Sequence, residues 1–180
     1  GENSLSSATS GGSNIAIGGL AGANNTSANS NMYIGYAAGY GNQAGTNNTI
    51  VGNYSLSQTV GIVNFTNVTT LGWEAGYYAT GSYNTFVGSE AGKGGQTSAP
   101  FSSGQYNVAM GYKALTAFTT SNNNVAIGRE AGYRITSGGT NVAIGYQAMS
   151  GIVTGGTNVA LGYYSLGQVT SGENNVGIGR

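Results

Sequence analysis

Glycine recurs along this chain at a nearly fixed interval, and that interval limits the folds open to it. The recurring glycines are Gly1, Gly18, Gly35, Gly52, Gly72, Gly88, Gly111, Gly128, Gly145, Gly162 and Gly179, at steps of 17, 17, 17, 20, 16, 23, 17, 17, 17 and 17 residues. Most of them end one motif, clearest in Asn124-Val-Ala-Ile-Gly128. So short a period predicts a solenoid, in which no single coil can bury its apolar side alone. We therefore expect an all-β, parallel β-solenoid, with residues 1–180 forming one continuous array of about ten coils.

The composition argues against several other classes of protein. Glycine accounts for 34 of 180 residues but proline for only one, which does not fit collagen. Apolar residues make up 39% and charged residues 6%, which argues against disorder. Five basic residues balance five acidic ones, so no basic patch for nucleic acid is expected. No apolar run approaches the ~18 residues of a membrane span, and we expect no membrane insertion within this segment.

Asparagine stands four residues before the repeat glycine in nine units, and Val68 takes its place in one. Asparagine tolerates left-handed backbone and bonds its own backbone at corners. Identical amides in stacked strands can also chain into a ladder. We therefore expect this column to be a structural corner ladder rather than a ligand site. The column is Asn14, Asn31, Asn48, Asn84, Asn107, Asn124, Asn141, Asn158 and Asn175.

Three residues lie between this asparagine and the glycine, as in Ile15, Ala16 and Ile17. The first and third share one face of a strand, and we expect them to fill the interior of the coil stack. The middle residue then points outwards. Because that row is never charged and contains Ile50 and Phe86, it indicates a second buried face against another chain. The alternative is a row of small residues tolerated at the surface.

Two further features concern the remainder of each coil. In the C-terminal half, an apolar residue follows seven positions after the glycine and predicts a third wall, formed by Phe118, Ile135, Ile152 and Val169. The two longest steps predict loop insertions near 57–67 and 93–104, since insertions in repeat proteins map to loops on one face. Segment 93–104 is the stronger candidate for a protrusion.

Large aromatic residues occupy the position directly after the glycine in several units. They are Tyr36, Trp73, Tyr112, Tyr146 and Tyr163. Arg129 shares that column, which indicates at least partial exposure. A line of exposed aromatic rings can stack on the sugar rings of a glycan, and Phe101 in the longer insertion is a further candidate contact. The alternative interpretation is that these rings shield the coil stack and its interface.

The residue types of most enzymes and metal sites are missing. The chain contains no Asp, His or Cys, so we predict no catalytic residue, no metal ligand and no cofactor. Glu74, Glu90, Lys113 and Glu130 share one column, two residues after the glycine. Lys113 is predicted to pair with both Glu90 and Glu130 on a solvated face.

The sequence motif Asn-Val-Ala-Ile-Gly-x-x-Ala, present at 124–131 and 141–148, resembles the head repeats of YadA-type trimeric autotransporter adhesins and similar repeats in bacteriophage tail fibres. The resemblance covers the whole chain, less well in coils three to five. It implies a left-handed β-roll with three chains packed side by side, hence a homotrimer. The 17-residue unit is somewhat longer than the adhesin-head unit and closer to fibre-type members.

These features together predict a non-enzymatic fibre segment that is extracellular, on a cell or a virion. It would carry or form a surface for a host receptor. Because the chain starts and stops inside a repeat, we interpret it as a window of a longer fibrous protein.

One alternative is a glycan-binding module that uses the Tyr/Trp column. A remote alternative is an ice-binding solenoid, which would need a regular threonine row. The row before the asparagines instead mixes Thr140 and Thr157 with Asn, Ser and Tyr. The sequence does not separate an adhesin from a phage fibre.

Overall fold

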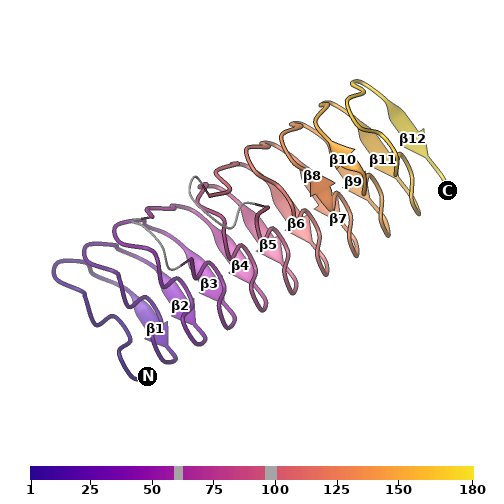
Figure 1. Ribbon diagram of the computed structural model, residues 1–180. Coiled ribbons are helices and arrows are strands. Elements are labelled where there is room, and N and C mark those ends of the chain that lie inside the picture. Colours follow the sequence, from indigo (N-terminus) through magenta and orange to yellow (C-terminus); the bar gives the residue numbers. More distant parts are fainter. Residues whose placement is uncertain (59–62, 96–100) are drawn as a thin grey trace.

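The computed structural model of the chain is a parallel β-solenoid, which confirms the predicted fold class. It describes residues 1–58, 63–95 and 101–180, and within these ranges it contains strands and turns but no helix. The coils stack along one axis, with the two termini at opposite ends of the rod (Figure 1). Each repeat therefore contacts the coils before and after it, as the short period predicts.

The asparagine-to-glycine triplets form the strands of one ten-stranded parallel sheet. Neighbouring triplets pair without slippage, so that Ile15 lies opposite Met32 and Ile17 opposite Ile34. Its strands are β1 (Ile15–Ile17), β2 (Met32–Ile34), β3 (Thr49–Val51), β4 (Thr69–Leu71), β5 (Thr85–Val87), β6 (Val108–Met110), β7 (Val125–Ile127), β9 (Val142–Ile144), β11 (Val159–Leu161) and β12 (Val176–Ile178). A second sheet pairs β8 (Arg134–Ile135) with β10 (Ile152–Val153).

The middle residues of the strands point into the coil, and the first and third residues point outwards, the reverse of the prediction. Ala126 and Ala143, in the middle of their strands, are completely buried, as are Tyr33, Ile50, Thr70, Phe86, Ala109 and Ala160 in the other central strands. The first and third positions face outwards, and Ile17 and Leu71 are 58% and 51% exposed. The prediction that the first and third rows fill the interior was therefore wrong. Alternation separates two faces but does not say which one a narrow coil encloses.

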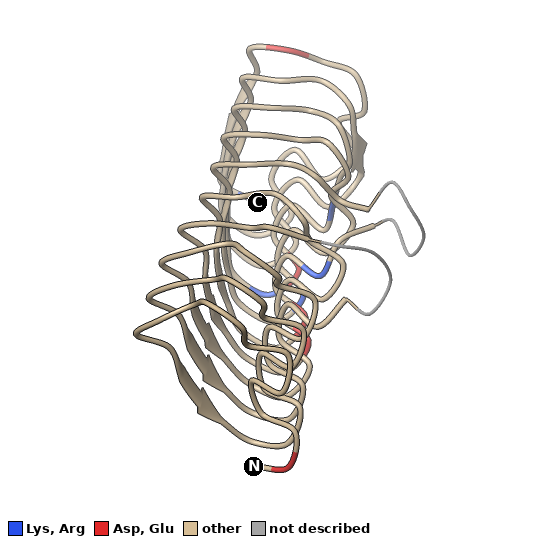
Figure 2. Cartoon of the chain, turned by 90° about the vertical axis from the view of Figure 1, so that its left-hand side faces the viewer, with Lys and Arg blue, Asp and Glu red and all other residues tan. Residues whose placement is uncertain are grey.

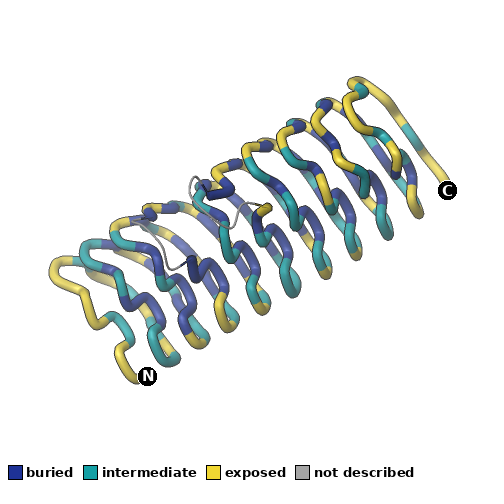
Figure 3. The backbone as a smooth tube through the Cα atoms, in the orientation of Figure 1, coloured by how far each residue is buried: buried dark blue, intermediate teal, exposed yellow. Residues whose placement is uncertain are grey.

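The size of the interior explains this orientation. Opposite the middle row lies a column of Ala or Ser, three residues after each repeat glycine. This column is buried from Ala21 through Ala148. From Ala109 onwards the residues of the middle row are also small, which lets the walls of a coil approach closely. Where the middle residue is Tyr33 or Phe86, Gly39 or Gly92 leaves room for the ring. Figure 3 shows the terminal coils as more exposed than the central ones. Ala16 and Gly177, in those coils, are accordingly only half-buried.

The third wall is confirmed at Phe118 and Ile135, which are completely buried. It is wrong at Ile152, which is 46% exposed, because Val153 takes the buried place in that coil. Val169 is only partly buried. Of the two predicted insertions, residues 59–62 and 96–100 lie outside the described residues. The described end of the first insertion folds back onto the core, where Phe65 is 1% exposed.

Candidate functional site

The asparagine column forms a hydrogen-bonded ladder along the coil stack. The Asn141 side-chain oxygen accepts from both the backbone N–H and the side-chain amide of Asn158, at 2.9 and 3.0 Å. The Asn141 amide in turn donates to the carbonyl of Gly155 at 3.1 Å, and its backbone N–H donates to Asn124 at 2.9 Å. The side chains of the central members are buried. With both their amide donors and their oxygens engaged inside the protein, these residues act as structural corners.

Two details of the ladder differ from the sequence-based picture. The left-handed backbone belongs to the residue before each ladder asparagine, such as Asn123 with φ of 58° and Thr140 with φ of 60°. Val68 also interrupts the ladder. Its backbone N–H donates to the Asn48 side chain at 2.9 Å, but it has no amide to pass on to Asn84. The ladder is thus divided into a segment of three asparagines and a segment of six.

The aromatic residues that follow the glycines lie on the surface. Tyr36, Trp73, Tyr112 and Tyr163 are 43% to 52% exposed, and Tyr146 is half-buried. The column therefore presents ring surface to solvent. Phe101 does not belong with it, because it is only 9% exposed and stacks parallel to Tyr78 at 6.4 Å. Phe101 is therefore not one of the rings that this surface presents to solvent, and its role as a ligand contact stays a prediction.

Cations lie between the aromatic rings in the C-terminal half of the column. The Arg129 guanidinium is 5.9 Å from the Tyr112 ring and 5.4 Å from the Tyr146 ring. Tyr146 stacks on Tyr163 at 5.3 Å, and Arg180 lies 5.4 Å from the Tyr163 ring. Such contacts are worth about 0.5–1 kcal/mol at exposed sites. The rings are thus held in line along the stack.

Sequence reasoning missed a second exposed aromatic pair. Tyr83 and Tyr106 stack at 4.9 Å with their planes 8° apart, and both are about half exposed. They occupy the left-handed position before the asparagine, where φ is 62° and 58°. The signal was present in the sequence, because both stand in the row that otherwise holds Ser, Asn and Thr.

Charged residues are few and lie mostly in the middle coils of the solenoid (Figure 2). Lys93 pairs with Glu74 and Glu90, and Lys113 approaches Glu90 at 3.7 Å. Burial lowers the pKa of Lys93, but its hydrogen bonds to the two carboxylates outweigh burial and leave the pKa raised. The predicted pairing of Lys113 with Glu130 was wrong. Arg129, at 3.5 Å, and the Gln147 amide, at 2.7 Å, are the partners of Glu130.

The outward face of the ten-stranded sheet is apolar over its whole length. It presents the first and third residues of ten strands, twenty side chains of which three are threonine and the rest aliphatic or methionine. Ile17, Leu71, Met110 and Ile144 on this face are 38% to 58% exposed. Soluble monomers rarely expose a contiguous apolar patch larger than a few hundred Å². This sheet face therefore presents a strip of exposed apolar side chains along the described coils.

The described residues show little other chemistry. No group of three or more acidic, histidine or cysteine residues is placed to hold a metal ion in the parts of the chain that the structure describes. In the same parts, no helix has the length and apolar character to cross a bilayer. No protein-family model matches the sequence, and comparisons with curated proteins and with solved structures give no match. The fold by itself defines the chain as a β-solenoid repeat protein.

Proposed function

We propose that this chain is a rigid structural segment of an extracellular fibre or adhesin, in which copies of the chain pack through the outward face of the ten-stranded sheet. The observation that carries the proposal is that face itself, which is uncharged and mostly aliphatic along the stack. A second solenoid of the same period is the partner that fits it best, because its strands repeat at the same spacing of about 4.8 Å.

The resemblance to trimeric adhesin heads and phage fibres favours three chains around one axis. A sheet one coil wide presents a long, narrow strip, and three such strips can close around an axis and leave none exposed. The repeat supplies length and stiffness, and the described residues supply no catalytic constellation. Carrying or forming a receptor-binding surface on a cell or a virion is the role that suits such a rod.

Sedimentation of the purified chain tests this proposal. We expect a trimer for the native chain and a monomer for the variant Ile127→Lys/Ile144→Lys, which places two charges on the apolar face. The matched control is Gln105→Lys/Thr154→Lys, which adds the same charge at exposed positions outside that face. A native chain that sediments as a compact monomer, or an assembly unaffected by the two isoleucine substitutions, contradicts the proposal.

One observation favours a second function, glycan binding by the aromatic column. Trp73 is 47% exposed, and Lys93 lies 5.8 Å from its ring. The other exposed tyrosines of the column follow along the same edge of the stack. A glycan array probed with the native chain and with Trp73→Ala tests this function. We expect the substitution to reduce the signal, and an array without hits, or with hits that Trp73→Ala leaves unchanged, excludes it.

A further inference from the structure

One coil of the C-terminal half departs from the repeat without changing its length. In β8 and β10, Ile152 lies opposite Arg134 and Val153 opposite Ile135, an offset of 18 residues in an array whose local period is 17. The coil regains the register at Gly155, which accepts from the Asn141 amide 14 residues before it, as Gly138 does from Asn124. Ser150–Ile152 therefore holds one extra residue, and Ile152 is turned outwards.

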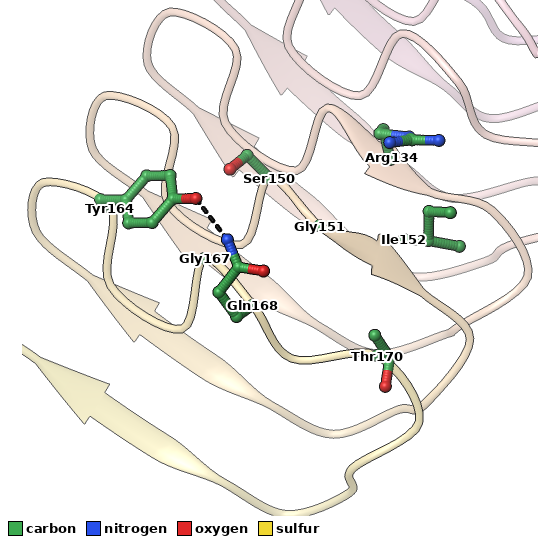
Figure 4. Close-up of a pocket in the computed structure, with 8 residues that line it drawn as sticks. All are labelled: Arg134, Ser150, Gly151, Ile152, Tyr164, Gly167, Gln168 and Thr170. Atoms are coloured by element: carbon green, nitrogen blue, oxygen red, sulfur yellow. Dashed lines mark hydrogen bonds between the residues drawn. The ribbon is translucent and has the colours of Figure 1, made fainter.

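This bulge borders a cleft on the surface of the last coils. The cleft has a volume of about 340 Å³, within the range of small-molecule sites. Arg134 and Ile152 lie on one side, and Tyr164 and Gln168 lie on the other (Figure 4). Without the extra residue, Ile152 would occupy the buried wall position that Val153 takes, and this border would be absent.

Arg134 differs from the other basic residues of the described chain in how its charge is compensated. Lys93, Lys113 and Arg129 have glutamate partners, and Arg180 lies against Tyr163. Among the ion pairs and ring contacts of the described residues, Arg134 takes part in none, and its side chain is exposed. An arginine fork matches a carboxylate in a bidentate geometry.

The opposite side of the cleft offers a ring and hydrogen-bonding groups. The Tyr164 side chain is 39% exposed, and its hydroxyl accepts a hydrogen bond from the Gln168 amide at 2.6 Å. That bond leaves the tyrosine proton free to be donated and turns the Gln168 oxygen away from the ring (Figure 4). Ile152, 46% exposed, adds apolar surface next to Arg134.

We propose that this cleft binds a carboxylate-bearing saccharide, with Arg134 on the carboxylate, Tyr164 and Ile152 against the sugar ring, and Gln168 on a hydroxyl group. An arginine that faces an aromatic ring and a hydrogen-bonded amide across one cleft suits an acidic sugar better than a neutral one. The site is separate from the aromatic column, which contains neither Arg134 nor Tyr164.

The cleft remains open when the chain assembles through its sheet face. Its lining comes from β8, β10 and the turns after β11, and the two-stranded sheet lies across the core from the ten-stranded one (Figure 2). A ligand on a cell surface would therefore reach every copy in an assembly. Repetition of one weak site raises the avidity for a polymer that carries many acidic sugars.

Titration calorimetry and saturation-transfer NMR on the full chain test this inference. The probes are 3′-sialyllactose, with one carboxylate on its terminal sugar, and trigalacturonate, with one on every sugar. The neutral matches are lactose and carboxyl-reduced trigalacturonate. We expect at least one acidic probe to bind and its neutral match to bind at least about tenfold more weakly. Arg134→Gln should lower the affinity for the acidic probe at least about tenfold. Gln105→Glu lowers the net charge by the same amount at an exposed position outside both the cleft and the aromatic column, and it should leave the affinity unchanged.

Several outcomes would overturn the inference. They are equal binding of the neutral match, no binding of either acidic probe, and unchanged affinity after Arg134→Gln in a variant whose thermal unfolding matches the native chain. Displacement of the sugar by inorganic phosphate at equal concentration would also overturn it, because the site would then select any anion. None of these results bears on assembly, which sedimentation measures separately.

Discussion

Gly39 lies directly against the ring of Tyr33, with no room for a side chain between them. A Cβ atom added at Gly39 would lie 2.3 Å from the Tyr33 ring, and the residue has φ of 63°. Tyr33 is the largest buried side chain of the middle row, and Gly22, which precedes it in the sequence, approaches its ring from the other side. A wide residue inside the coil is therefore accommodated by glycines where other coils carry leucine or methionine.

Gly39→Ala should destabilise the chain strongly. The substitution adds left-handed strain to overpacking against the Tyr33 ring, and we expect a loss of about 2–4 kcal/mol in the free energy of unfolding. Gly12→Ala is the matched control, because its added Cβ has only the Asn29 side chain nearby, at 3.8 Å. Denaturant unfolding at equal protein concentration measures both, and a loss of equal size in the two variants would contradict the argument.

Removal of one ladder amide should also destabilise the chain. Asn124→Ala deletes the acceptor for the backbone N–H of Asn141 and the donor to Gly138, both inside the protein. Buried groups left without a partner cost about 1–3 kcal/mol each, so we expect a loss of at least about 2 kcal/mol. The measurement is the unfolding midpoint at fixed denaturant slope.

Asn122→Ala serves as the control for the ladder variant. Asn122 lies two residues away and is exposed, although it bonds to Gln105 at 2.6 Å and to Thr120 at 3.1 Å. Water can replace both of those bonds, so the expected cost is below about 1 kcal/mol. If Asn122→Ala costs as much as Asn124→Ala, the contribution of the ladder comes from local turn geometry and not from its burial.

The buried Tyr33 hydroxyl should make stability depend on alkaline pH. Burial raises its pKa to about 12, even though a hydrogen bond from Asn42 at 2.7 Å lowers it. An unfolded tyrosine loses its proton near pH 10, as the ordinary pKa requires. Between pH 10 and 12 the unfolded chain therefore binds fewer protons than the folded one, and stability falls as the pH rises.

Comparison with Tyr33→Phe isolates this effect, because the remaining tyrosines titrate in both proteins. Relative to that variant, the native chain should lose about 2–3 kcal/mol of stability between pH 9 and pH 12, from the ~1.4 kcal/mol carried by each pKa unit. Chemical unfolding at several pH values gives the difference directly. Parallel profiles for the two proteins would show that Tyr33 reaches water before the chain unfolds.

The sequence was sufficient to predict the solenoid and its strands, because a fixed period and the triplet pattern act on every coil. It was not sufficient to predict the inner face, since Ala126 and Ile127 are both apolar and alternation is symmetric. The narrow space inside the coil decides which face of the strands points inwards, and that space depends on how two walls of the coil pack against each other. The bulge before Val153 was invisible for a different reason. Its extra residue is removed again within the same coil, so the glycine spacing stays at 17.

The candidate sites also differ in whether the sequence could predict them. A column that repeats in every coil, such as the aromatic one, can be read from spacing, and the exposure of Tyr112 and Tyr163 follows from their place beside the glycine. The cleft at Arg134 arises from a single irregularity and from residues on three successive coils. No repeat pattern contains that information, because it depends on how one coil packs on the next.

Val68→Asn should repair the interruption in the ladder. Val68 is 1% exposed, and its backbone N–H already donates to the Asn48 side-chain oxygen, as the backbone N–H of an asparagine would. An asparagine of similar volume would reach the Asn84 backbone with its oxygen, as Asn84 itself does for Asn107 at 2.8 Å. We expect a gain of about 1 kcal/mol, because one more buried hydrogen bond replaces a modest aliphatic contact. Val153→Asn, which buries the same amide at a wall position without a ladder, should instead destabilise the chain. If Val68→Asn loses as much stability as Val153→Asn, the apolar packing of Val68 contributes more than a continuous ladder would, and the prediction fails.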